Sequence, residues 1–322
     1  MCRQQWRAEI CRSLDENGIA WQKDAPLAPL TTFRIGGPAA LLCRPTDAAH
    51  LQKLLELLRQ AGVRFYCLGR GSNTLFADEG FDGAVVATEA LRAVTLTADG
   101  IQAQAGASLA AVCRTAQAAG LSGLEFAYGI PGSVGGAVYM NAGAYGGEMK
   151  DAVRTVQAIC PNGSVAAFEN AACRFAYRHS AFEENGAAVL SADFALRRDD
   201  PAAIAARMEE YAARRREKQP LEWPSAGSTF RRPQGGVCGC SHRPVRPEGR
   251  VGRRGARQRK ACGLCHQRGR GHLCRCAGAD REDHCRCPGK NRLYAGARDP
   301  RGAVKQRGRS QCGPFAVCRA AA

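Results

Sequence analysis

The spacing of apolar side chains predicts several short helices along the first two thirds of the chain. Trp6, Ile10 and Leu14 recur at intervals of four residues and Gly18 ends the pattern, so we expect an amphipathic helix at the start. Further helices are predicted where a capping residue precedes similar spacing: after Thr46 or Asp47 with Leu51, Leu54, Leu55 and Leu58 on one face, from Ser108 to Ala119, and from Pro201 through Ile204, Met208 and Tyr211.

Short apolar runs between these helices have the length of β-strands. Turn residues between neighbouring runs predict hairpins at Asp82-Gly83, Asp99-Gly100 and Pro161-Asn162-Gly163. The region from about residue 31 to residue 198 is therefore predicted to be α+β and rich in short strands. We expect strands at 40–43, 64–68, 94–96, 101–103, 153–160, 165–168 and 188–196.

The stretch from Gly123 to Gly147 has the most unusual composition of the chain. It contains eight glycines at irregular spacings, and Glu125 is its only charged residue. Glycine permits positive φ and lets backbone amides come within hydrogen-bonding distance of a ligand, so this composition suits a backbone surface around a phosphate group. Composition alone also allows a turn-rich structural loop.

A second loop, Gly69-Arg70-Gly71-Ser72-Asn73, follows a predicted strand. It lacks the G-x-G-x-x-G pattern of a dinucleotide-binding Rossmann turn, because no third glycine follows before a helix. This departure points away from a doubly wound sheet and toward a flavin fold in which the pyrophosphate lies between two small α+β subdomains. Ordinary turn chemistry is the alternative explanation for Ser72 and Asn73.

Five segments, in chain order, carry a resemblance to a known family. They are Thr31-Thr-Phe-Arg-Ile-Gly-Gly37, Leu68-Gly-Arg-Gly-Ser-Asn73, Gly129-Ile-Pro-Gly-Ser-Val-Gly-Gly-Ala-Val-Tyr-Met-Asn-Ala-Gly-Ala-Tyr-Gly146, Tyr177-Arg-His-Ser-Ala-Phe182 and Ala226-Gly-Ser-Thr-Phe230. Together they resemble the UDP-N-acetylenolpyruvoylglucosamine reductases, the MurB family of peptidoglycan precursor synthesis, in its shorter subtype. The resemblance runs from about residue 27 to residue 236.

The resemblance implies a PCMH-type (vanillyl-alcohol-oxidase-like) FAD-binding domain of two small subdomains, followed by an α+β substrate domain that is incomplete here. It also implies FAD and NADPH as cofactors, no metal, and reduction of the UDP-sugar UDP-N-acetylglucosamine enolpyruvate to UDP-N-acetylmuramate. The implied FAD contacts are Arg34, Gly36, Gly69, Arg70, Gly71, Ser72, Asn73, Gly129, Ile130, Pro131, Gly132, Ser133, Gly135, Gly136, Asn141, Gly143 and Ala144.

The same resemblance implies two catalytic residues. Reducing an enol ether conjugated to a carboxylate requires a hydride source, groups that stabilise the developing enolate, and a proton donor. Arg178 matches the arginine that stabilises the enol, and Ser228 matches the serine that donates the proton. His179 is expected to pack or cap. The family's third catalytic residue, a glutamate near the C-terminus within Leu-Glu-Pro-Glu-Ile-Arg, has no counterpart here, so we expect an impaired copy.

Charge and cysteine are concentrated after residue 236. Residues 1–236 contain 25 Lys and Arg against 24 Asp and Glu, a net charge of +1, whereas residues 237–322 contain 21 against 5, a net charge of +16. Nearly all of the chain's net charge of +17 therefore belongs to the last 86 residues. Seven cysteines lie in the first part, most of them singly in apolar runs, as reduced core cysteines do; ten lie in the second.

Three interpretations compete for this basic tail. A zinc module that binds nucleic acid would use Cys262, Cys265 and His266, but only one C-x-x-C occurs and its neighbours are C-x-C pairs. A disordered basic tail fits the composition. We favour a reading-frame error. If each codon is read from the third base of the family's codon, the family segment Ser-Glu-Lys-His-Ala-Gly-Phe-Val-Ile-Asn can encode residues 259–267 of this chain. The same offset turns the family segment Phe-Met-Leu-Glu-Pro-Glu-Ile-Arg into residues 294–300. The same shift fits residues 237–244, and it accounts for the missing glutamate.

These inferences divide the chain into an N-terminal helix (1–26), the FAD-binding domain (27–198), the start of a substrate-binding domain (199–236) and an out-of-frame, disordered tail (237–322). No signal peptide or membrane span is expected, so we predict a cytoplasmic protein. The partner we expect is the UDP-sugar substrate, with no nucleic acid and no membrane, and no obligate protein partner is inferred. Two alternative functions stay open. One is another PCMH-type FAD oxidoreductase, against which the lack of a histidine in residues 70–73 argues. The other is a basic zinc or nucleic-acid-binding protein that acts through its tail.

Overall fold

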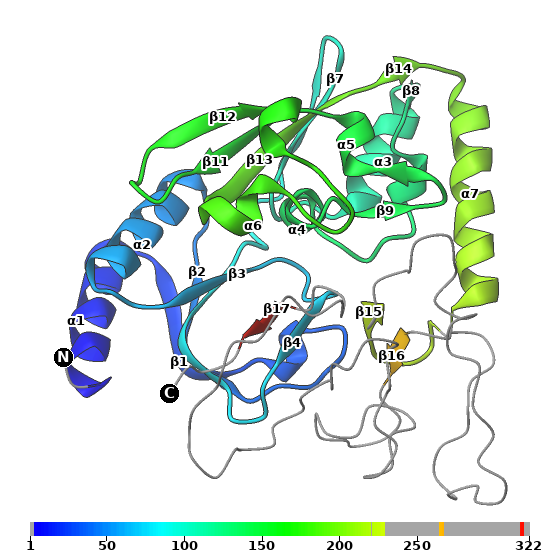
Figure 1. The fold of residues 1–322 in the computed structure, drawn as a ribbon. Coiled ribbons are helices and arrows are strands. Elements are labelled where there is room, and N and C mark those ends of the chain that lie inside the picture. Colours follow the sequence, from blue (N-terminus) through cyan, green and yellow to red (C-terminus); the bar gives the residue numbers. More distant parts are fainter. Residues whose placement is uncertain (1–2, 220, 229–263, 267–315, 319–322) are drawn as a thin grey trace, which may run out of the picture.

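The computed structural model describes residues 3–219, 221–228, 264–266 and 316–318. Two separate sheets form most of it, with the first in the lower part and the second in the upper part of Figure 1. Most of the predicted tail, including residues 237–263 and 267–315, lies outside the described residues. The prediction that this tail is disordered therefore also concerns residues outside the described part of the chain.

The first sheet has four strands in the order β1 (Ala20–Pro26), β2 (Pro38–Arg44), β5 (Phe81–Ala87) and β3 (Phe65–Leu68). β1 runs antiparallel to β2, whereas β2, β5 and β3 are parallel. Helices α1 (Arg3–Glu16) and α2 (Ala48–Gln60) lie beside this sheet in Figure 1 and share one apolar cluster with it. Residues 20–26, which the sequence placed with the N-terminal helix, are thus an edge strand of this sheet.

The second sheet has five antiparallel strands in the order β12 (Val165–Glu169), β11 (Val153–Ile159), β13 (Ala188–Ala195), β7 (Gly100–Gln104) and β6 (Val94–Thr97). Its apolar side chains form the largest core cluster, together with residues of α3 (Leu109–Ala118), α4 (Val134–Tyr139) and α7 (Pro201–Lys218). The predicted hairpins at Asp99-Gly100 and Pro161-Asn162-Gly163 join neighbouring strands of this sheet and are confirmed.

Local capping chemistry fixes the starts of three helices where the sequence predicted them. The Asp47 side chain accepts a hydrogen bond from the His50 amide at the start of α2, Ser108 accepts from Ala111 at the start of α3, and Asp200 accepts from two amides at the start of α7. The predicted helix starts are therefore confirmed.

The hairpin predicted at Asp82-Gly83 is wrong. Both residues lie inside β5, between its parallel neighbours β2 and β3. A Cβ on Gly83 would lie 2.5 Å from the carbonyl oxygen of Arg64 and 2.8 Å from the Phe81 ring. Glycine therefore serves close packing at this position and makes no turn.

Short helices and strands lie outside the two sheets, and the short strands of the described residues pair in four two-stranded sheets of their own. No helix among the described residues is long and apolar enough to span a membrane. Burial raises the pKa of the Cys43 and Cys113 thiols to about 12, in keeping with their prediction as reduced core cysteines. The short elements are η1 (Ala28–Leu30), β4 (Thr74–Phe76), β8 (Leu121–Ser122), η2 (Glu125–Ala127), β9 (Gly143–Ala144), β10 (Gly147–Glu148), α5 (Met149–Ala152), η3 (Asn170–Cys173), α6 (Ala181–Asn185), β14 (Arg197–Arg198), β15 (Ser225–Ser228), β16 (Leu264–His266) and β17 (Ala316–Cys318).

Candidate functional site

Thr32 joins three of the segments that the sequence singled out. Its amide donates a hydrogen bond to the carbonyl of Gly71 (3.1 Å), so the 31–37 loop lies against the 69–73 loop. Its hydroxyl donates to the carbonyl of Ser225 (2.6 Å), and the amide of Ser225 donates back to the Thr32 carbonyl (3.1 Å). The strand that ends at Ser228 therefore starts beside both loops.

Glycine is required at two positions of the 69–73 loop because other parts of the site come so close. A Cβ on Gly69 would lie 2.1 Å from the hydroxyl oxygen of Ser133, which places this loop against the glycine-rich segment. A Cβ on Gly71 would lie 2.2 Å from the carbonyl oxygen of Leu30, and Gly71 has a φ of +61°. The predicted FAD-contacting loops are thus brought together in space.

Two polar features at this junction fit the diphosphate of FAD. The Ser133 hydroxyl is buried, with the residue 2% exposed, and has no hydrogen-bond partner among the described residues. In the same part of the structure, the amides of Arg70, Gly71 and Ser72 donate to no acceptor that the described chain provides. Buried polar groups are normally paired, so the Ser133 hydroxyl, with the loop amides beside it, fits a ligand with many acceptor oxygens.

Ser228 is the last residue of β15, and its strand runs along the 69–73 loop. A Cβ on Gly227, the residue before it, would lie 3.5 Å from the Ser72 carbonyl oxygen. β15 pairs antiparallel with β16, so that Ser228 is opposite Leu264. The backbone of the predicted proton donor therefore lies next to the predicted cofactor loop.

Arg178, the predicted enol-stabilising residue, lies at the tip of a two-residue turn. Ala176 and His179 pair antiparallel across the turn through two backbone hydrogen bonds of 3.0 and 3.1 Å. Arg178 has a φ of +56°, is partly buried, and its guanidinium has no ion-pair partner among the described residues. His179 Nδ1 lies 2.8 Å from Glu183 Oε2, a pairing with a carboxylate where packing or capping was expected. The turn presents a cation that is available for an anionic group.

Asn141 was predicted to contact FAD, and in the structure its side chain forms hydrogen bonds within the protein. It is 2% exposed with a φ of +42°. Its Nδ2 donates to Glu148 Oε2 (2.9 Å) and to the carbonyl of Ala176 (3.0 Å), and its Oδ1 accepts from the Lys150 amide (3.0 Å). The side chain amide is therefore engaged by the protein and reaches the turn that carries Arg178.

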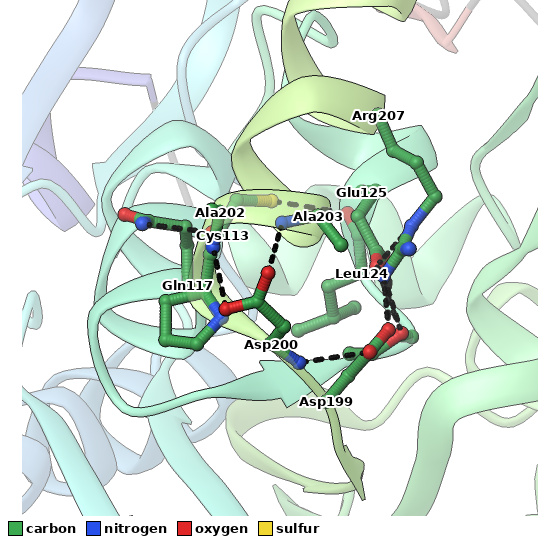
Figure 2. Close-up of polar contacts among 12 residues, drawn as sticks. Cys113, Gln117, Leu124, Glu125, Asp199, Asp200, Ala202, Ala203 and Arg207 are labelled. Atoms are coloured by element: carbon green, nitrogen blue, oxygen red, sulfur yellow. Dashed lines mark hydrogen bonds and ion pairs between the residues drawn. The ribbon is translucent and has the colours of Figure 1, made fainter.

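Helix α7 is fastened to the start of the glycine-rich segment by an ion pair that sequence reasoning missed. Figure 2 shows Arg207 of α7 reaching both Glu125 and Asp199. Glu125 is 8% exposed, and its Oε1 accepts from Arg207 Nη2 (2.8 Å) and from the Ser122 hydroxyl (2.8 Å). Its Oε2 accepts from the Gly123 amide (2.8 Å). Glu125 is thus held by both elements.

Two further contacts continue this attachment along α7. The rings of Tyr211 and Tyr145 stack with centroids 4.8 Å apart, and the Cδ of Arg215 is 3.2 Å from where a Cβ on Gly129 would lie. Arg207, Tyr211 and Arg215 are four residues apart and so share one helix face. Burial lowers the pKa of Arg215 from its usual value. This face of α7 supports the glycine-rich segment from Glu125 to Tyr145.

Replacing Glu125 with glutamine should reduce the fall of the protein's Tm as the pH is lowered into the acid range. Burial opposes ionisation of Glu125 and is the largest single influence, but hydrogen bonds from backbone amides, Arg207 and Ser122 together hold its pKa below its usual 4.5. A lowered folded-state pKa stabilises the fold above pH 4.5, and this contribution is lost as the pH falls through the folded-state value. The measurement is Tm from pH 7 down to pH 3, where Glu125→Gln should lose less Tm than the unaltered chain.

Glu89→Gln is the matched control, because Glu89 forms an exposed ion pair with Arg44. A Glu125→Gln curve parallel to that of the unaltered chain over the whole range would contradict the assigned role of the Glu125 network.

Comparisons with known proteins found a matching domain family and similar reductases. A profile of the FAD binding domain matches residues 39–169. The UDP-N-acetylenolpyruvoylglucosamine reductase of Lactobacillus delbrueckii subsp. bulgaricus is 43% identical over 226 residues, which are 70% of this chain and 76% of that protein. The chain belongs to the UDP-N-acetylenolpyruvoylglucosamine reductase family. The reductase of Syntrophomonas wolfei is 46% identical over 211 residues, 65% of this chain and 71% of that protein.

A solved structure of this reductase family agrees with the fold. The crystal structure of the enzyme from Thermus caldophilus is similar to this chain with a TM-score of 0.59 and 32% identity, over 69% of this chain and 77% of that one. The comparisons confirm the predicted family, the α+β fold with a PCMH-type FAD-binding domain, the oxidoreductase class, and FAD and NADPH as cofactors. The domain boundaries and the roles of single site residues stay predictions.

Proposed function

We propose that this chain is a flavin-dependent reductase that uses NADPH to reduce UDP-N-acetylglucosamine enolpyruvate to UDP-N-acetylmuramate. The observation that carries the proposal is that the 69–73 loop contacts both the 31–37 loop and the glycine-rich segment. It meets that segment at the Ser133 hydroxyl, which has no partner among the described residues. Family membership supplies the reaction class. The proposal includes no nucleic-acid, membrane or obligate protein partner.

Each of these residues would have a separate role in binding the cofactor or in the reaction. Bound FAD supplies two-electron transfer from NADPH to the enolpyruvyl double bond. The amides of Arg70, Gly71 and Ser72, with the Ser133 hydroxyl, would hold its diphosphate. The Arg178 guanidinium would stabilise the negative charge that develops on the substrate, and the Ser228 hydroxyl would give the proton that completes the reduction.

The direct test is the absorbance of the purified chain between about 350 and 480 nm, where bound flavin absorbs. We expect a yellow protein whose absorbance bleaches on addition of NADPH without oxygen. A colourless chain that takes up no added FAD would overturn the proposal. Retention on nucleic acid with a strong salt dependence, or bound zinc, would favour the alternative of a function in the tail.

We further propose that this copy has little activity, because a change of reading frame replaces most of its substrate domain. In this proposal the substrate domain begins at about residue 199 with α7. The excess of basic residues after residue 236, 21 against 5 acidic, and the lack of a counterpart to the family's C-terminal glutamate support it. Resequencing across the codons for Gln234 to Cys240 tests it; a clean read that no single-base correction restores would rule it out.

A further inference from the structure

We infer that Asn141 and Ser180 are positioning residues that clamp the Arg178 turn onto the glycine-rich segment from both sides. The inference rests on the proposed function for the role of Arg178. The clamp itself rests on contacts between described residues. It consists of two side-chain hydrogen bonds that run in opposite directions between the same two pieces of chain.

The first bond runs from the glycine-rich segment to the turn. Asn141 Nδ2 donates to the carbonyl of Ala176 at 3.0 Å, across 35 residues of sequence. The same carbonyl accepts the amide of His179 across the turn at 3.1 Å. Asn141 is itself fixed by Glu148 and by the Lys150 amide, so it holds the first strand of the turn rigidly.

The second bond runs from the turn back to the glycine-rich segment. The Ser180 hydroxyl donates to the carbonyl of Tyr139, the last residue of α4, at 2.7 Å. Ser180 is completely buried and lies directly after His179, on the other side of the turn from Ala176. The two anchors therefore flank Arg178, two residues before it and two residues after it.

The conformation of Arg178 explains why the turn needs anchors. Its φ of +56° is in the left-handed region, which an arginine rarely adopts unless its surroundings impose it. A turn held on both sides fixes the backbone from which the Arg178 side chain extends, and orientation affects how well a charged group stabilises a transition state. Asn141 and Ser180 thus act on the reaction through Arg178.

The test compares Asn141→Ala and Ser180→Ala with the unaltered full-length chain and with Arg178→Ala. Hydrogen exchange of residues 176–180 should become about tenfold faster or more in both variants, because each loses a buried anchor. Bleaching by NADPH should stay within about twofold in Ser180→Ala, because Ser180 is not among the implied FAD contacts. Reoxidation by UDP-N-acetylglucosamine enolpyruvate, followed over a single turnover without oxygen, should slow about tenfold or more toward the rate of Arg178→Ala.

Asn170→Ala is the matched control. Its Nδ2 also donates to two carbonyls, those of Lys150 (2.8 Å) and Val153 (2.6 Å), but it does not touch the turn. Asn170→Ala should change neither the exchange of residues 176–180 nor the ratio of the two flavin rates.

Two results would overturn the inference: unchanged exchange at residues 176–180 in both variants, or an equal loss of both flavin rates in Ser180→Ala. If Asn141→Ala does not fold, Ser180→Ala decides alone. An unaltered chain that NADPH does not bleach would instead count against the proposed function. The exchange of the turn would still be readable in that case, so the two failures are distinguishable.

Discussion

Replacing Gly71 with alanine should abolish FAD binding and destabilise the protein by about 3 kcal/mol or more. The added Cβ would lie 2.2 Å from the carbonyl oxygen of Leu30 and 2.8 Å from the Cα of Thr31, and both are backbone atoms that cannot rotate away. The φ of +61° adds the cost of left-handed backbone. Any relaxation would separate the 31–37 loop from the 69–73 loop, where the diphosphate is proposed to bind.

Gly62→Ala separates the two contributions. Gly62 follows α2 with nearly the same φ, +64°, but a Cβ there would have no atom within 4 Å. It should cost only about 1 to 2 kcal/mol and leave FAD affinity unchanged. Urea unfolding and FAD titration would be measured for both variants. Equal losses of stability, with FAD still bound by Gly71→Ala, would show that the close approach at Gly71 does not matter.

The elements that could be predicted from the sequence are those whose signals are local. Asp47, Ser108 and Asp200 each cap a helix through amides within three residues of themselves, so a short window of sequence carries the information. The strand β5 was missed because its Asp82-Gly83 pair is a turn signal in isolation. Only the parallel strands on either side reveal that glycine is needed there for packing.

The candidate site also has parts that could be predicted from the sequence and parts that could not. The glycine-rich segment stands out by its composition, whereas the Arg178 segment was found only through its resemblance to the family's motif. The contacts that bring these loops together could not be predicted: Thr32 reaches Ser225 across 193 positions, Ser180 reaches Tyr139 across 41, and Arg207 reaches Glu125 across 82. Thr32 and Ser180 lie inside recognised motifs, but a motif does not say which distant carbonyl a hydroxyl bonds, and Arg207 lies in no motif at all.

Restoring the reading frame near codons 234–240 should raise kcat/KM for UDP-N-acetylglucosamine enolpyruvate by at least about 100-fold. A single general acid contributes about 10² to 10⁴ in rate, and the corrected chain would regain the family's C-terminal glutamate. It would also regain apolar strands in place of a segment with 21 basic and 5 acidic residues. The FAD-binding part would be unchanged, since residues 39–169 precede the altered codons.

Bleaching by NADPH distinguishes a repaired substrate site from a general gain in folding. Because the described FAD-binding segments lie before the altered codons, the bleaching rate per bound FAD should change by no more than about threefold, while reoxidation by substrate accelerates. Arg178→Ala in the corrected chain should remove most of the gain, because the turn would still lack its cation. A corrected chain that is yellow, bleaches normally and still turns over no faster than the original would show that the tail is not the defect.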